Sequence, residues 1–178
     1  MQHVLVLPFP AQGHVNPLMR FSLKLAQRGF KVTFVNTDFT QKRVMSATNG
    51  ELNLKGSAVR LLSVPDGLGP EDDRSDFASL ALAILRTMPS AIQKLIKDNI
   101  NGLHHDHDGG GEKITAMVVD LYMAWGLEVA DELGIKGVVF CPHSAAVFAL
   151  EENIPNLIDK GILNSDGKGF LQLKNSSR

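Results

Sequence analysis

His14 is the residue of this chain best placed to carry chemistry. It ends the sequence PFPAQGH, which lies between a short apolar run over 4–7 and an apolar pattern of helical spacing over 17–25 that stops at Gly29. The run predicts a strand buried on both faces, and the spacing predicts an amphipathic helix. We therefore expect His14 in a tight loop where a strand leads into a helix, a corner that often forms sites in open α/β sheets. An imidazole there can exchange a proton near neutral pH.

Asp120 is the second candidate, because it ends another apolar run over 114–119. In a doubly wound sheet of order 3-2-1-4-5, the first and fourth strands are neighbours about 4.8 Å apart, so His14 and Asp120 can meet at the sheet edge. A carboxylate bonded to one imidazole nitrogen fixes the tautomer and stabilises the imidazolium. Two alternatives stay open: His14 bonds to its own backbone at a helix start, and Asp120 caps the following helix.

The sequence offers this pair no protein nucleophile. Ser144 and Cys141 lack a G-x-S-x-G context, which favours a dyad that activates a hydroxyl of the substrate. PFPAQGH is not G-x-G-x-x-G, and Asn36-Thr37 stand where a ribose-binding acid would end the second strand. Both observations disfavour a nicotinamide or flavin oxidoreductase.

Alternating strand and helix signals must position these side chains. Strands are expected at 4–7, 31–36, 58–64, 114–119 and 137–140, and helices at 17–28, 40–48, 76–88, 125–133 and 144–152. Pro89 is expected to interrupt the third helix, which then resumes from Ile92. The alternation predicts an α/β fold with a Rossmann-like, doubly wound parallel sheet and helices on both faces.

Composition limits the classes of function. The 178 residues are 44% hydrophobic with a formal charge of −1, which gives no basic surface for nucleic acid or anionic membranes. The single Cys141 excludes an internal disulfide framework, and no run is long enough for a membrane span. We expect one domain over 1–163, a polar loop or tail over 164–178, and a cytoplasmic protein.

The segment 101–113, NGLHHDHDGGGEK, has three histidines within four positions. Metal binding is one interpretation, but nothing apolar fixes the ligands and three successive glycines raise the cost of ordering them. We expect a solvated loop without a metal.

Residues 8–37 and 118–150, together with ENIPNLIDKGIL, closely resemble the plant-type UDP-sugar-dependent glycosyltransferases of family 1. The QGH-x-x-P corner, the strand ending at Asp120 and LGI-x-x-V-x-F occur in that family's order and at compatible spacing. The resemblance implies a GT-B fold of two facing Rossmann-like domains. This chain would be the amino-terminal, acceptor-binding half, and the donor-binding domain would lie outside it, possibly on a second chain.

The family's functional residues can be carried over by position. His14 falls on the general base and Asp120 on its supporting aspartate. Gln12 and Gly13 shape the loop beside the base, and Tyr122 falls on a position where an aromatic side chain lines the acceptor pocket.

Two further positions rest on weaker matches. Leu85, in the apolar helix over 80–88, is assigned to the acceptor pocket, with the hydrophobic core as its alternative. Ser144 lies near a segment that contacts the donor sugar, although FCPHSA lacks the more usual Trp-Thr pair.

The resemblance implies inverting transfer of a sugar, with glucose expected, from a UDP-sugar to a small, partly apolar phenolic, flavonoid or terpenoid alcohol. The scheme needs no cofactor and no metal, because helix amino termini and neutral donors can hold the diphosphate. The chain alone is expected to be inactive without its donor domain. The alternative is a non-catalytic Rossmann-like module that binds a small ligand or a partner.

Overall fold

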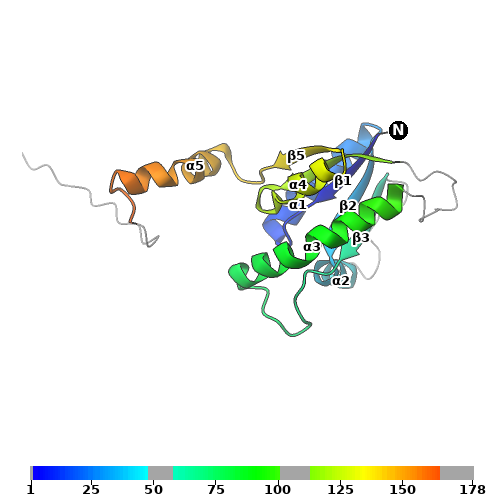
Figure 1. Cartoon of the computed structure of the whole chain (residues 1–178), viewed down its shortest axis with the longest axis horizontal. Coiled ribbons are helices and arrows are strands. Elements are labelled where there is room, and N and C mark those ends of the chain that lie inside the picture. The colour runs from blue at the N-terminus through cyan, green and yellow to red at the C-terminus, as the bar shows by residue number, and fades with distance from the viewer. Residues whose placement is uncertain (1, 48–57, 101–112, 165–178) are drawn as a thin grey trace, which may run out of the picture. The chain divides into compact units, whose positions relative to one another are not determined.

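The computed structural model describes residues 2–47, 58–100 and 113–164, and these fall into two compact units that divide between Pro142 and His143. The first unit contains a five-stranded parallel sheet of order β3-β2-β1-β4-β5 (Figure 1). Its strands are β1 His3–Leu7, β2 Lys31–Thr37, β3 Val59–Val64, β4 Ile114–Asp120 and β5 Lys136–Phe140. The predicted sheet and strand order are confirmed, and β1 lies beside β4 with Leu7 opposite Val119.

Helices cover both faces of this sheet (Figure 1). They are α1 Gln12–Gln27, α2 Asp38–Ala47, α3 Phe77–Ile100 and α4 Gly126–Glu132, with a short 3₁₀ turn, η1, over Leu121–Met123. On one face Leu5 and Val119 pack with Ile84 of α3. On the other, Val6 and Phe34 pack with Leu18 of α1. The period-two alternation of strand side chains thus produces two separate cores.

The first helix begins earlier than the sequence predicts. The pattern placed its start at Pro17 and His14 in a loop, but α1 begins at Gln12, so His14 lies in its first turn. Ala11 is extended and its carbonyl accepts from the amides of His14 and Val15 at 2.9 Å. Pro17 is the sixth residue of α1, so its missing N–H removes one hydrogen bond of the helix, and burial of the neighbouring Leu18 offsets that loss.

The third helix is continuous, and the predicted interruption at Pro89 is wrong. Ile84, Met88, Ile92 and Ile96 form one buried stripe that passes the proline. A proline inside a helix costs about 3 kcal/mol, whereas each buried side chain of this size contributes roughly 1.5–3 kcal/mol. Packing of the whole stripe therefore outweighs the local penalty.

Gly67, in the turn that follows β3, has a positive φ of 87° and lies against α3. A Cβ there would meet Thr87 Oγ1 and approach the Ala83 carbonyl oxygen at 2.8 Å. We expect Gly67→Ala to lower the free energy of unfolding by about 3 kcal/mol, from backbone strain and steric overlap together.

Gly134→Ala is the matched control for this prediction. Gly134 has a φ of 65°, but no atom lies within 4 Å of a Cβ built there. Its cost should be about 1 kcal/mol of backbone strain alone. Urea unfolding followed by circular dichroism measures both variants, and equal losses would contradict the close packing of Gly67 on α3.

The second unit contains α5, Ala145–Asp159. The Ser144 hydroxyl caps it by accepting a hydrogen bond from the Val147 amide at 3.3 Å. His143 Nδ1 lies 3.2 Å from Glu151 Oε2 in the same unit. Across the described parts of the chain, no helix has the length and apolarity that a membrane crossing requires.

Candidate active site

His14 and Asp120 meet at the carboxyl edge of the sheet, where β1 leads into α1 and β4 ends. His14 Nδ1 lies 2.9 Å from Asp120 Oδ2, although 106 positions separate the two residues along the chain. Because β1 and β4 are neighbouring parallel strands, their carboxyl ends reach the same edge. The topology thus creates the contact that strand order predicts.

Asp120 is fully buried and both of its oxygens have partners. Oδ2 faces His14, and Oδ1 accepts a hydrogen bond from the backbone amide of Tyr122 at 2.9 Å. A carboxylate can only accept, so Nδ1 of His14 carries the proton and the lone pair of the neutral ring is on Nε2. Asp120 therefore caps the following turn through Oδ1 and pairs with His14 through Oδ2, so both interpretations hold.

Aromatic rings surround the imidazole. The Tyr122 ring centroid is 5.0 Å from that of His14, and Phe9 makes an edge contact with His14 at 5.4 Å. Phe9 also stacks on Phe77, the first residue of α3, at 6.0 Å. Tyr122 and Phe77 are 49% and 59% exposed, so large apolar surfaces face solvent beside the histidine. Such surfaces suit a ligand with a flat apolar body.

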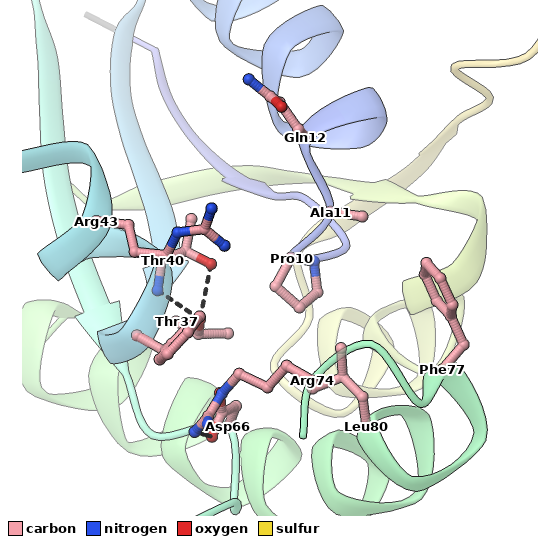
Figure 2. Close-up of a pocket in the computed structure, with 11 residues that line it drawn as sticks. Pro10, Ala11, Gln12, Thr37, Thr40, Arg43, Asp66, Arg74, Phe77 and Leu80 are labelled. Atoms are coloured by element: carbon pink, nitrogen blue, oxygen red, sulfur yellow. Dashed lines mark hydrogen bonds and ion pairs between the residues drawn. The ribbon is translucent and has the colours of Figure 1, made fainter. Parts of the chain in front are cut away.

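A cavity of about 190 Å³ opens between the β1–α1, β2–α2 and β3–α3 connections (Figure 2). Phe77 and Arg43 lie on opposite sides of the view, with Pro10 and Ala11 between them. Gln12, two residues before His14, also lines it. His14 itself does not line the cavity, but Phe9 links the two, because it contacts both His14 and the lining residue Phe77. Its remaining lining is Thr37, Phe39, Thr40, Asp66, Arg74 and Leu80.

Arg74 holds one wall of this cavity in place. Its Nε and Nη2 donate to the two oxygens of Asp66 at 2.8 and 3.1 Å, a bidentate pair. The other three N–H groups donate to backbone carbonyls of the same connection, at Leu68, Gly69 and Asp72. The guanidinium also lies 4.1 Å from the Phe39 ring centroid, so it packs against the start of α2. The hydrogen bonds to Asp66 raise the pKa of Arg74 above its usual value.

Removing this guanidinium should be costly, because Asp66 is only 4% exposed. We expect Arg74→Met to lower the free energy of unfolding by about 3 kcal/mol, since it leaves a buried carboxylate unpaired. Adding Asp66→Asn to that variant should restore part of the loss, because the unpaired charge is then removed. Arg86→Met, at an exposed arginine of α3, should change stability by less than about 0.5 kcal/mol. Urea unfolding measures all three variants, and a loss in Arg74→Met no larger than in Arg86→Met would contradict a stabilising role for the Arg74–Asp66 pair.

The structure brings some of the predicted site residues together. Gln12 lines the cavity and Tyr122 lies beside His14. Gly13 lines a neighbouring open hollow with Asn16 and Pro17 instead. Leu85 is 53% exposed on α3 and does not line the cavity beside His14. Ser144 belongs to the second unit, where it caps α5.

Sequence reasoning missed the residues from the second and third strand ends. Thr37 and Asp66 follow the apolar runs of β2 and β3, just as His14 and Asp120 follow β1 and β4. That shared position was a usable signal, because all four carboxyl ends meet at one edge. Arg43 and Arg74 had no such signal, since they lie away from the strand ends.

The described part of the chain contains no group of three or more His, Cys, Asp or Glu side chains that could hold a metal ion. The histidine-rich segment over 101–113 lies almost wholly outside the described residues.

The family described as "Glycosyltransferase, N-terminal domain" matches residues 2–151. Among curated proteins, UDP-glycosyltransferase 83A1 of Arabidopsis thaliana is 39% identical over 169 residues, covering 93% of this chain and 35% of the relative. A 7-deoxyloganetin glucosyltransferase of Gardenia jasminoides is 30% identical over 162 residues, covering 90% and 33%. The chain thus spans about a third of the length of the curated relatives it matches.

Solved structures share the fold. A UDP-glucose: anthocyanidin 3-O-glucosyltransferase in complex with UDP aligns with a TM-score of 0.68 at 23% identity, covering 89% of this chain and 34% of that one. Os79 from O. sativa, in complex with U2F and trichothecene, aligns with a TM-score of 0.64 at 23% identity, covering 90% and 37%. The sheet described above is therefore the arrangement found in the amino-terminal half of these GT-B proteins.

Proposed function

Since this chain belongs to the glycosyltransferase family, as an amino-terminal domain of the plant UDP-glycosyltransferase type, we propose that it forms the acceptor-binding half of a sugar-transferring enzyme. The reaction is the inverting transfer of a sugar, with glucose expected, from a UDP-sugar to a hydroxyl of a small acceptor. The contact between His14 Nδ1 and Asp120 Oδ2 carries the proposal.

The proposed chemistry follows from that contact. Nε2 of His14 takes the proton of the acceptor hydroxyl as its oxygen attacks the anomeric carbon from the face opposite UDP. A carbon–oxygen bond forms, the bond to the diphosphate oxygen breaks, and UDP leaves with the electron pair. Asp120, buried and bonded to Nδ1, offsets the charge that His14 gains. His14 then loses the proton to solvent.

The surroundings of His14 support a small, partly apolar acceptor. Tyr122 and Phe77 supply exposed aromatic surface, and the cavity beyond Gln12 adds polar groups. The relatives' names mention 7-deoxyloganetin and an anthocyanidin. We therefore propose phenolic, flavonoid or terpenoid alcohols as the acceptor class for this chain.

The donor side of the reaction is assigned to protein outside these 178 residues. We propose a carboxyl-terminal, UDP-sugar-binding domain as the partner of this half, with transfer in the cytoplasm and without a metal ion. Ser144 is proposed to contact the donor sugar, and its side chain already accepts one hydrogen bond from the Val147 amide.

A chimeric enzyme tests this function. Residues 1–178 would replace the aligned amino-terminal segment of UDP-glycosyltransferase 83A1, which supplies the remaining length. With UDP-glucose and a panel of phenolic, flavonoid and terpenoid alcohols, we expect glucosides in which the anomeric carbon is inverted, read by mass spectrometry and NMR. Acceptor binding by calorimetry without any transfer would instead favour a non-catalytic binding module.

A further inference from the structure

We propose that Arg43 makes this site selective for acceptors that carry a carboxylate, which the cavity beside His14 binds at the end away from the histidine. The inference deepens the proposed function and rests on it, because only a sugar-transferring enzyme makes the bound carboxylate compound an acceptor. The binding preference itself stands on the cavity alone.

Among the charged residues that line the cavity, one arginine has no acidic residue of the lining to neutralise it. The lining contains two arginines and one aspartate, Arg43, Arg74 and Asp66. Asp66 and Arg74 neutralise each other in a bidentate pair, and all five guanidinium N–H groups of Arg74 donate within its own connection. Arg74 therefore has no donor left for a ligand.

Arg43 differs from Arg74 in each of these respects. It is exposed on α2, and among the described residues its recorded partner is the Phe39 ring, 5.7 Å from the guanidinium carbon. A contact with an aromatic face leaves the N–H groups in the guanidinium plane able to donate to a carboxylate. Figure 2 shows the Arg43 side chain pointing into the cavity.

Thr40 supplies a second donor to the same place, three residues before Arg43 on the helix. The Thr37 hydroxyl donates to Thr40 Oγ1 at 3.0 Å and accepts from the Thr40 amide at 3.2 Å. The Thr40 hydroxyl hydrogen is therefore directed away from Thr37, and Thr40 also lines the cavity. Residues three apart on a helix share a face, so this hydroxyl and the Arg43 guanidinium can bind one carboxylate together.

The surrounding field favours an anion. Thr40 lies in the first turn of α2, where the helix dipole is positive. Asp38 is the one acid in the sequence of α2, and it does not line the cavity. An anion beside Arg43 therefore meets no uncompensated carboxylate among the described lining residues.

The two ends of the site thus have different functions: one presents the base and the other presents the cation. Phe77 lines one end and is connected to His14 through Phe9, which contacts both, and Arg43 lies across the cavity from Phe77 (Figure 2). A phenolic acid, with a hydroxyl at one end and a carboxylate at the other, matches this arrangement of base and cation.

The test uses ferulic acid and its methyl ester, which differ only in the charged group. Calorimetry of the 178-residue chain should show the acid binding about fivefold more tightly than the ester at low salt. Arg43→Gln should abolish that preference while leaving ester affinity within about twofold, and Arg43→Lys should keep part of it. Raising ionic strength from about 0.05 to about 0.5 M should weaken the preference in the wild type.

Arg86→Gln is the matched control, because it removes the same charge from an exposed arginine outside the cavity lining. It should retain the wild-type preference. Equal affinity for acid and ester in the wild type, failure of both to bind, or a preference that survives Arg43→Gln would overturn the proposal.

The chimeric enzyme separates this proposal from the proposed function. If it glucosylates the ester as efficiently as the acid, sugar transfer stands and the role of Arg43 fails. If calorimetry shows the Arg43-dependent preference and neither compound is glucosylated, the anion site stands and the proposed function fails.

Discussion

Replacing His14 by alanine in the chimeric enzyme should lower kcat by about 10²–10⁴-fold, the range that a positioned general base contributes. The expected cause is specific: the variant removes the nitrogen that takes the acceptor proton, while the exposed ring of Tyr122 beside it remains. KM for the acceptor should therefore change little, so that kcat and kcat/KM fall together.

Controls for His14→Ala must separate chemistry from folding. The His14 side chain is 13% exposed and its recorded ion pair is with Asp120, so the variant also leaves a buried carboxylate without the imidazole. His14→Gln keeps a donor near Asp120 and lacks the base, so it should be equally inactive and more stable. Thermal unfolding and acceptor calorimetry of both variants report on folding and binding. Transfer within about threefold of the parent chimera would refute the base assignment.

Asp120→Asn should cause the second largest loss of activity, a decrease in kcat of roughly 10–10³-fold, because it changes which nitrogen of His14 carries the proton. The amide oxygen must accept from the Tyr122 amide, as Asp120 Oδ1 now does at 2.9 Å. The amide NH₂ then faces His14 Nδ1, which must accept and so loses its proton to Nε2. A protonated Nε2 cannot take the proton of the acceptor hydroxyl.

This variant also separates the two interpretations of Asp120. Asparagine is a good cap, so the amide contact to Tyr122 and the fold should survive. Steady-state kinetics with the best acceptor of the panel, together with a melting curve, measures both effects. Parent-level activity in Asp120→Asn would leave Asp120 as a cap alone.

Local pattern was sufficient for the sheet and for the pair at its edge. The apolar runs that end at Leu7 and Asp120 predict two buried strands, and the doubly wound order 3-2-1-4-5 makes them neighbours. The meeting of His14 and Asp120 was predictable because it depends only on strand order and on which end of each strand a residue follows.

Local pattern failed where packing outweighs propensity. Pro17 and Pro89 look like helix boundaries, yet both lie inside helices. Pro89 is tolerated because the buried stripe through Met88 and Ile92 runs on both sides of it. Those burials depend on the sheet beneath α3, which a window of neighbouring residues does not contain.

The sequence by itself determined the fold class, because short-range apolar periodicity marks the strands and helices, and it predicted the approach of an imidazole to a carboxylate once the doubly wound order 3-2-1-4-5 was assumed. The tertiary structure alone decided which charges remain for a ligand. Arg43 and Arg74 look alike in the sequence. Arg74 donates all its N–H groups within its own connection, whereas Arg43 points into the cavity. That difference arises from the folding of the connections after β2 and β3 around one another, a long-range arrangement that residue type and spacing do not encode.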